Sequence, residues 1–318
     1  MVRKALVIGS LGQIGTELTL RLAGEYGEEN VWATDIRQAP EGLLGGVSFA
    51  LLDALDAQAV ERLVVEKGIT DVYHLSAVLS AVGEKNPMAA WRLNMDSLLT
   101  VLNLAKDGKI DKIFWPSSIG AFGPNTKLDL TPQYTVMDPD TVYGISKLSG
   151  ELWCKYYHEK YGVDVRSVRF PGIISWKAMP GGGTTDYAVD IFHKAVTEGR
   201  YECFLSERTY LPMIYMPDAL DAIVGLMAAP SENIRVRTSY NLASMSFCPE
   251  ELAEVVARLV PGFTMTYRPD FRQQIADTWP DALDDVCARV DWGWKPRYDI
   301  DAMSADMVEN LKRKYGLI

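Results

Sequence analysis

The stretch Ala5-Leu-Val-Ile-Gly9-Ser-Leu-Gly12-Gln-Ile-Gly15 decides the fold of this chain. Residues 5–8 form a short apolar run typical of a buried strand, and three spaced glycines follow before a helical pattern begins at Leu18. Glycines let backbone amides approach a pyrophosphate closely, and the positive end of a helix dipole favours its charge. The spacing therefore predicts a dinucleotide-binding turn between a strand and a helix.

The next strand, expected over 31–34, ends on Asp35, twenty residues after Gly15. An acid at this place accepts hydrogen bonds from the adenosine ribose hydroxyls and repels a 2′-phosphate, so Asp35 predicts NAD rather than NADP. Arg37 is a contrary signal, because an arginine just beyond this strand could hold a phosphate. The structural alternative for Asp35 is a plain turn residue at a strand end.

Strands alternate with helices through residue 175. Further strands are expected over 46–52, 70–75, 112–115 and 163–170. This alternation predicts an α/β fold, a Rossmann-type doubly wound parallel sheet over residues 1–175, followed by a smaller substrate-binding lobe over 176–318 that is partly interleaved with it. Ligands of such sheets lie at the carboxyl ends of the strands. The residues expected to contact the cofactor there are Gly9, Gly12, Gln13, Ile14, Asp35, Ile36, Asp53, Leu75, Ser76, Ala77, Asn94, Tyr143, Lys147 and Pro171.

Tyr143 and Lys147 stand four residues apart at the head of a long amphipathic stretch. On a helix such residues share one face. A neighbouring ammonium group lowers the pKa of a phenol from its usual value of about 10, which makes the phenolate available as a base. A surface pair on an ordinary helix is the structural alternative, since this spacing is common by chance.

Composition places the chain among soluble globular proteins, with 48% hydrophobic and 23% charged residues in 318. A net charge of -10 argues against nucleic acid and anionic membranes as partners. The first apolar run stops at Gly9, too soon for a signal peptide or a membrane-spanning helix, so a cytoplasmic location is expected. Cysteines and histidines are scattered, which predicts neither a metal site nor a disulfide. They are Cys154, Cys203, Cys248, Cys287, His74, His158 and His193.

A set of residues, in this order and spacing, resembles the extended short-chain dehydrogenase/reductase superfamily over essentially the whole chain. The set comprises Gly9, Gly12, Gly15, Asp35, Asp53, Asn94, Ser118, Tyr143 and Lys147. Within it, residues 8–18, 114–118, 169–173, 183–188 and 215–219 are similar to NAD-dependent L-threonine 3-dehydrogenases of the epimerase-like type, which are distinct from the zinc-dependent ones. The superfamily usually has threonine where Ile8 stands, a departure that leaves the catalytic positions intact.

The resemblance implies a reaction in threonine catabolism and three catalytic residues. Tyr143 would take the proton of the C3 hydroxyl of L-threonine while hydride passes from C3 to NAD, which gives 2-amino-3-oxobutyrate. Lys147 would hold the nicotinamide ribose and keep the pKa of Tyr143 low. Ser118 would orient the substrate hydroxyl, and Asn94 would position the backbone of the site.

Residues after 175 are expected to build the substrate side. The resemblance implies that Ser80, Gly183, Thr184 and Thr185 bind the carboxylate and amine of the amino acid. Asp186 could meet the substrate ammonium or cap the following helix, and both remain open. Trp279 resembles a tryptophan that closes over substrate, with a core or interface aromatic residue as the alternative.

Three readings of function share these residues. Besides the dehydrogenase, a nucleotide-sugar epimerase or dehydratase would keep every cofactor residue and would need cations for a diphosphate, for which Arg208, Arg235 and Arg237 are candidates. A non-enzymatic NAD-sensing regulator is disfavoured because the three catalytic residues are intact. The resemblance also implies a homodimer formed by the helices at 94–104 and 143–161. Residues that could supply its apolar face, or simply face the sheet, are Leu99, Leu152, Trp153 and Tyr156.

Overall fold

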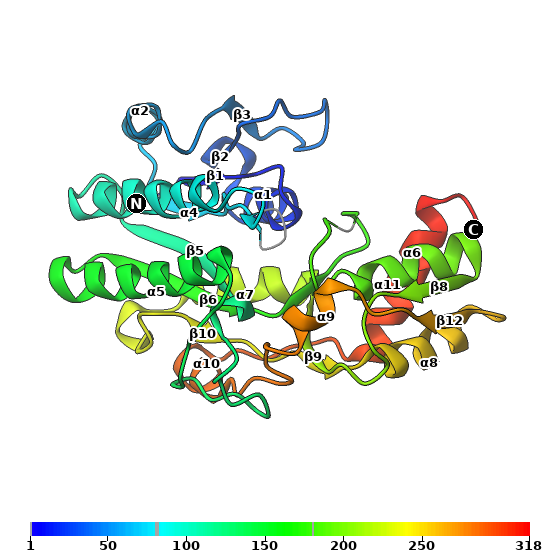
Figure 1. Cartoon of the computed structure of the whole chain (residues 1–318). Helices are drawn as coiled ribbons and strands as arrows, with labels where there is room; N and C mark the ends of the chain where they lie inside the picture. Colours follow the sequence, from blue (N-terminus) through cyan, green and yellow to red (C-terminus); the bar gives the residue numbers. More distant parts are fainter. Residues whose placement is uncertain (1, 80–82, 180) are drawn as a thin grey trace. The chain divides into compact units, whose positions relative to one another are not determined.

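The computed structural model describes residues 2–79, 83–179 and 181–318 (Figure 1). The chain groups into two compact units, each assembled from three separate stretches. The first comprises Met1–Ala121, Thr141–Arg169 and Leu220–Tyr240. The second comprises Phe122–Asp140, Phe170–Ala219 and Asn241–Ile318. The units therefore interleave along the sequence, because residues 122–140 group with the second unit and 220–240 with the first.

A seven-stranded sheet organises the first unit, in the order β10-β6-β5-β4-β1-β2-β3. The neighbours β1–β2, β1–β4, β2–β3 and β4–β5 all run parallel. The order 3-2-1-4-5-6 is that of doubly wound dinucleotide-binding sheets, and it reverses between β1 and β4. The predicted fold class is confirmed. The strands are β1 (Ala5–Ile8), β2 (Val31–Asp35), β3 (Ser48–Leu51), β4 (Asp71–His74), β5 (Lys112–Ser118), β6 (Asp164–Phe170) and β10 (Tyr240–Asn241).

Helices connect these strands, and capping side chains set the starts of several of them. Asp56 accepts the amide of Ala59 at the start of α2, and Thr141 accepts the amide of Gly144 at the start of α5. Gly162 caps the C-terminus of α5 in the left-handed conformation that favours glycine. The cap on α5 thus places Tyr143 in its first turn. The helices of this part are α1 (Gln13–Tyr26), η1 (Glu28–Asn30), α2 (Ala57–Lys67), α4 (Pro87–Lys106), η2 (Ile119–Ala121), α5 (Val142–Tyr161), α7 (Met216–Ala228) and η3 (Ser231–Asn233).

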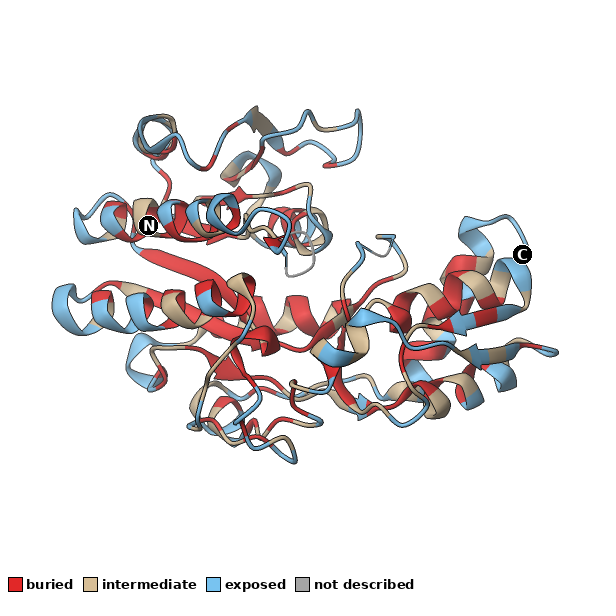
Figure 2. Cartoon of the chain, viewed as in Figure 1, coloured by how far each residue is buried: buried red, intermediate tan, exposed pale blue. Residues whose placement is uncertain are grey.

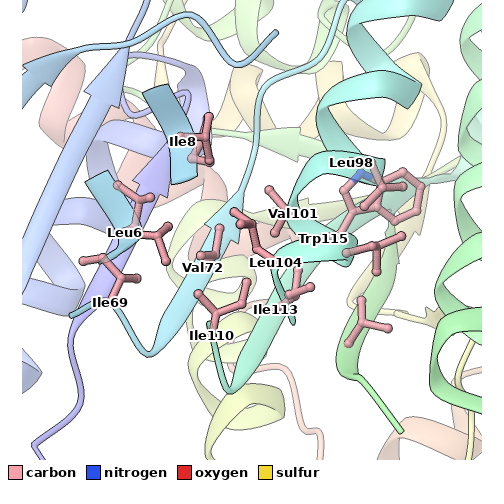
Figure 3. Packing of buried hydrophobic residues seen from close by; sticks show 14 of the residues in the cluster. Leu6, Ile8, Ile69, Val72, Leu98, Val101, Leu104, Ile110, Ile113 and Trp115 are labelled. Carbon is pink, nitrogen blue, oxygen red and sulfur yellow. The ribbon is translucent and has the colours of Figure 1, made fainter. Parts of the chain in front are cut away.

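The core of the first unit lies between the sheet and the helices α2, α4 and α5. Leu98 and Val101 of α4 pack with Ile113 and Trp115 of β5 in one buried cluster (Figure 3). Strand β5 is buried along almost its whole length (Figure 2). A Cβ atom at Gly150 of α5 would collide with the ring of Trp115, so glycine lets this helix approach β5 closely. This close approach brings the start of α5 to the carboxyl end of β5.

Two small sheets and several helices make up the described part of the second unit. In the order β11-β9-β7, β9 runs antiparallel to β11 and parallel to β7. Strands β8 and β12 form a parallel pair. Among the described residues, no helix is long and apolar enough to cross a membrane, and no group of three or more potential ligand side chains could hold a metal ion. The elements are β7 (Gly172–Ile174), α6 (Tyr187–Glu198), β8 (Arg200–Cys203), β9 (Leu211–Tyr215), β11 (Met245–Phe247), α8 (Pro249–Leu259), β12 (Thr264–Tyr267), α9 (Phe271–Ala276), α10 (Val286–Trp292) and α11 (Ile300–Lys314).

Candidate active site

The glycine turn between β1 and α1 has the geometry that the sequence predicts. Gly9 has a φ of +86°, and a Cβ atom there would lie 2.9 Å from the backbone nitrogen of Ser76. A Cβ atom at Gly15 would collide with the carbonyl oxygen of Gly9. Gly12 is the N-cap of α1, so no side chain caps this helix. A turn that requires glycine at positions 9 and 15, at a helix N-terminus without a side-chain cap, fits the pyrophosphate of a dinucleotide.

Asp35 lies at the end of β2 beside this turn and is 7% exposed. Its Oδ2 atom accepts the amide of Leu11 at 3.1 Å. Its Oδ1 atom accepts hydrogen bonds from the backbone nitrogen and from Nε of Arg37, each at 3.1 Å. The Nη2 atom of Arg37 donates to the carbonyl of Leu11 at 3.0 Å. The arginine that was the contrary signal is therefore held by the acid that favours NAD.

The other predicted cofactor residues of the first unit follow the carboxyl ends of its strands. Asp53 lies beyond β3, where its Oδ1 atom accepts the amide of Leu55 at 2.9 Å. The amide of Leu75 donates to the carbonyl of Ile8 at 2.9 Å, which holds the exit of β4 next to that of β1. Ile36 is exposed beyond β2. Pro171 belongs to the second unit, and the contacts of all these residues with a cofactor remain a prediction.

Tyr143, Lys147 and Ser118 come together at the end of β5. Tyr143 and Lys147 are 9% and 4% exposed, and the Lys147 Nζ atom lies 5.5 Å from the centroid of the Tyr143 ring. That ammonium donates to the carbonyl of Pro116 at 2.6 Å. A Cβ atom at Gly120 would lie 3.1 Å from the Tyr143 ring, so glycine lets the ring pack against this turn. Two elements far apart in sequence thus supply one cluster of polar groups.

Burial is the largest cause of the pKa shifts of Tyr143 and Lys147. It raises the pKa of Tyr143, and the nearby Ser118 hydroxyl opposes the rise only in part. Burial also lowers the pKa of Lys147 to about 7, with the buried groups Cys154 and Glu151 acting in the other direction. The prediction that Lys147 keeps the pKa of the phenol low is therefore not what the structure shows. The reason is that desolvation penalises both charged forms, while the ammonium bonds to Pro116.

Asn94 connects the exit of β4 to the helix that carries Tyr143. Its Oδ1 atom accepts the amide of Val78 at 2.8 Å, and its Nδ2 atom donates to the carbonyl of Val78 at 3.2 Å and to Ser146 Oγ at 3.0 Å. Ser146 in turn donates to the carbonyl of Tyr143 at 2.7 Å. These bonds tie the backbone on either side of the cluster together, which suits the predicted positioning role.

His74 is a buried polar residue of this region whose position the sequence did not reveal. It ends β4, and its Nε2 atom lies 2.8 Å from Ser97 Oγ. Because Ser97 donates to the carbonyl of Leu93, its oxygen accepts from His74, which assigns the proton to Nε2. Burial, with a smaller contribution from the charge of Lys147, lowers the pKa of His74 to about 3. The imidazole therefore stays neutral at physiological pH.

Sequence reasoning also missed a buried polar network formed by Ser117, Glu151 and Arg169. Ser117 Oγ donates to Glu151 Oε1 at 2.6 Å, and Arg169 forms an ion pair with the same carboxylate. The available signal was the spacing, because Glu151 stands four residues after Lys147 and so continues the face of the helix that carries the catalytic pair.

In the second unit, the predicted substrate residues cluster at the start of α6. Asp186 Oδ2 accepts the amides of Gly182 and Gly183 at 2.7 and 2.8 Å. Its side chain makes no capping bond to α6, so its observed contacts close the glycine turn instead. Thr184 is buried, and the Thr185 side chain lies against Gly172.

Two further substrate predictions concern Trp279 and Ser80. Trp279 follows α9 and is 7% exposed, with its amide donating to the carbonyl of Ala276 at 3.0 Å. This burial suits the core alternative as well as a contact with substrate. Ser80 lies outside the described residues. The roles of these residues and of the α6 cluster in substrate binding remain predictions.

Comparison with known proteins identifies the family. Residues 5–243 match the NAD dependent epimerase/dehydratase family. The chain belongs to this family. An uncharacterized epimerase/dehydratase of Staphylococcus saprophyticus is 47% identical over 315 residues, which is 98% of each chain.

Two solved structures give a narrower likeness. The GalE-like L-threonine dehydrogenase from Cupriavidus necator, in its holo form, is 54% identical with a TM-score of 0.95, over 97% of this chain and 100% of that one. A monomeric L-threonine 3-dehydrogenase from a metagenome, in its apo form, is 47% identical with a TM-score of 0.93, over 98% and 99% of the two chains. The resemblance stated from sequence motifs is confirmed over the whole chain.

Proposed function

We propose that this chain is an NAD-dependent L-threonine 3-dehydrogenase of the short-chain dehydrogenase type. The observation that carries the proposal is the cluster of Tyr143, Lys147 and Ser118 at the carboxyl end of β5, in a chain similar along its whole length to threonine dehydrogenases. The reaction converts the C3 hydroxyl of L-threonine to a ketone. Hydride passes from C3 to NAD, a proton leaves the hydroxyl, and the products are 2-amino-3-oxobutyrate and NADH.

The residues divide this chemistry between them. Tyr143 is the base that takes the hydroxyl proton, and Ser118, whose hydroxyl lies beside the phenol, orients the substrate hydroxyl. Lys147 provides donors for the nicotinamide ribose from the neighbouring turn of α5. When bound, NAD supplies the hydride acceptor and a positive ring charge that favours the phenolate. Burial of Tyr143 and Lys147 keeps bulk water away from the reacting groups.

NAD is the cofactor that the glycine turn and Asp35 support. Gly9, Gly12 and the N-terminus of α1 would hold the pyrophosphate. The Asp35 carboxylate would accept hydrogen bonds from the adenosine ribose hydroxyls. Arg37 is engaged by Asp35 and by the carbonyl of Leu11 rather than presented to a 2′-phosphate. We therefore expect a strong preference for NAD over NADP.

The family match is also consistent with the alternative function, a nucleotide-sugar epimerase or dehydratase. Such an enzyme needs cations for the substrate diphosphate. Arg208 pairs with Glu250 at 2.8 Å, and Arg237 pairs with Asp164 at 2.9 Å and also donates to Ser231. Two of the three candidate arginines are thus engaged in ion pairs, which favours the small substrate.

The experiment that separates the two functions is NADH formation, measured by absorbance at 340 nm. Purified protein is mixed with NAD and either L-threonine or a UDP-sugar. NADH from threonine, with little from NADP in place of NAD, supports the dehydrogenase. Turnover of the UDP-sugar without net NADH would support the epimerase and would overturn the proposed substrate.

A homodimer formed through α4 and α5 is part of the proposal. Leu152, Trp153 and Tyr156 of α5 are exposed, whereas Leu99 of α4 packs partly buried against the core. A relative described as monomeric is 47% identical, so the family resemblance alone does not decide the assembly. Sedimentation equilibrium of wild type and Leu152→Arg tests it. A monomeric mass for the wild type would contradict the dimer. We further propose that the enzyme works in the cytoplasm.

A further inference from the structure

Helix α5 carries a third buried polar residue in line with Tyr143 and Lys147. Glu151 stands one turn after Lys147 and is 1% exposed. Arg169 of β6, 3% exposed, donates from Nε to Glu151 Oε1 at 2.9 Å and from Nη2 to Oε2 at 2.7 Å. Ser117 of β5 donates to Oε1 at 2.6 Å. One carboxylate therefore joins two neighbouring strands to the helix that bears the catalytic pair.

Stability alone gives little reason for this arrangement. Moving the two charges of an ion pair from water into the core costs several kcal/mol per ion. Replacing such a pair by well-packed apolar residues of similar volume often leaves the stability of a protein unchanged or raises it. A bidentate arginine does, however, fix the position and orientation of a carboxylate. The Glu151 carboxylate is thus a rigid acceptor in the core, and the group it fixes in turn is the hydroxyl of Ser117.

Ser117 lies between the two backbone positions that contact the catalytic pair. The carbonyl of Pro116 accepts the Lys147 ammonium at 2.6 Å. The Ser118 hydroxyl lies close enough to the Tyr143 phenol to lower its pKa, and a Cβ atom at Gly120 would lie 3.1 Å from the Tyr143 ring and 3.6 Å from Ser118 Oγ. Because peptide groups are planar, a rotation at residue 117 would move both neighbours. Anchoring the Ser117 side chain therefore anchors both contacts at once.

We propose that Glu151, held by Arg169, is a positioning residue for the dehydrogenase reaction and acts through the Ser117 hydroxyl. It fixes the segment 116–118, and this segment sets where the Ser118 hydroxyl and the Lys147 ammonium lie relative to Tyr143. The inference rests on the proposed function, because it assigns these residues to the same reaction. It predicts an effect on turnover that exceeds the effect on folding or on NAD binding.

Ser117→Ala tests the proposal, with Ser167→Ala as the matched control. Both serines are 2% exposed in strands of the same sheet, and each hydroxyl has a buried partner, which for Ser167 is Ser239 in place of Glu151. Both variants should lower the melting temperature by similar amounts. Ser117→Ala should lower kcat for threonine oxidation about tenfold while the dissociation constant for NAD stays within about twofold. Ser167→Ala should keep both values within about twofold of wild type.

A second pair of variants tests the carboxylate itself. Glu151→Gln keeps an oxygen that can accept a hydrogen bond from Ser117, whereas Glu151→Leu does not, and both remove the negative charge that pairs with Arg169. Glu151→Gln should therefore retain more of kcat than Glu151→Leu. Equal kcat values for these two variants would overturn the role of the Ser117 bond.

The outcomes separate this inference from the proposed function. Wild-type protein that oxidises threonine, with Ser117→Ala turning over as fast as Ser167→Ala, would overturn the inference and leave the function standing. If wild type does not oxidise threonine, the function fails, and a crystal structure of Ser117→Ala decides the inference without turnover. The inference expects Lys147 to leave the Pro116 carbonyl or Ser118 to move from Tyr143. Unchanged positions for both would overturn it.

Discussion

Replacing Asp35 by serine should reduce the use of NAD and open the site to NADP. The carboxylate is buried at the end of β2, where it also holds Leu11 and Arg37. Hydrogen bonds to charged groups contribute about 1.5–3 kcal/mol each. Losing one such bond to the ribose corresponds to a fall of about 10- to 150-fold in kcat/KM for NAD, at about 1.4 kcal/mol for each factor of ten.

The gain for NADP comes from Arg37. In wild type its Nε atom bonds to Asp35 Oδ1 at 3.1 Å, and its side chain is 65% exposed. Without the carboxylate, the guanidinium can turn to a 2′-phosphate, and the repulsion between that phosphate and Asp35 is also removed. A charge-assisted bond of the same strength as the one lost would shift the preference between the cofactors by about 100-fold or more in total.

The assay is kcat/KM for each cofactor at saturating threonine, measured as reduced nicotinamide at 340 nm. The control is Arg37→Ala in the Asp35→Ser background. This double variant should keep the reduced kcat/KM for NAD but lose the increased kcat/KM for NADP. Two results would refute the reasoning. One is an Asp35→Ser enzyme with wild-type kcat/KM for NAD, and the other is an NADP gain that survives the loss of Arg37.

Three other predictions follow from the site and the glycine turn. Tyr143→Phe should lower kcat by about 100- to 10,000-fold with NAD affinity retained by fluorescence titration, and a loss under tenfold would exclude Tyr143 as the base. Because burial raises the pKa of Tyr143, kcat/KM for threonine should rise with pH from 6 to 9 as more of the phenol ionises. Lys147, whose pKa burial lowers to about 7, titrates in the same range, whereas His74, with a pKa of about 3, should add no step near pH 6.5; a flat profile would contradict this. Gly9→Ala should weaken NAD binding and lower the melting temperature. Gly24→Ala is the control, because a Cβ atom there meets nothing within 4 Å, and it should stabilise α1 by about 0.5–1 kcal/mol. Equal effects of the two variants in thermal unfolding would count against the strain assigned to Gly9.

Local patterns predicted the parts of this molecule that depend on neighbouring residues. The apolar run at 5–8 followed by Gly9 was enough to predict the first strand and the turn. The strand, the residue with positive φ and the start of the helix all lie within about a dozen consecutive residues. Tyr143 and Lys147 could be placed together from helical spacing alone. The rule that ligands lie at the carboxyl ends of parallel strands placed Ser118 at the edge of the sheet, and the family resemblance implied that it meets Tyr143 and Lys147.

Features that depend on contacts between distant segments were not predictable. The Glu151–Arg169 pair joins residues of α5 and β6, and a sequence gives no direct sign of such pairing. The direction of the Tyr143 pKa shift was predicted wrongly because spacing shows the neighbouring ammonium but not the degree of burial. Of the two alternatives for Asp186, the cap is not observed, and its bonds to Gly182 and Gly183 depend on the conformation of the glycine turn, while a contact with substrate stays a prediction.

The most direct test of the central claim is the fate of the hydrogen on C3 of L-threonine. Threonine deuterated at C3 is incubated with the protein and NAD, and the NADH formed is analysed by mass spectrometry. The account predicts one deuterium in each NADH, with Tyr143→Phe forming it far more slowly under the same conditions. Unlabelled NADH, or no NADH at all from threonine, would contradict the assignment of this chain as an L-threonine 3-dehydrogenase.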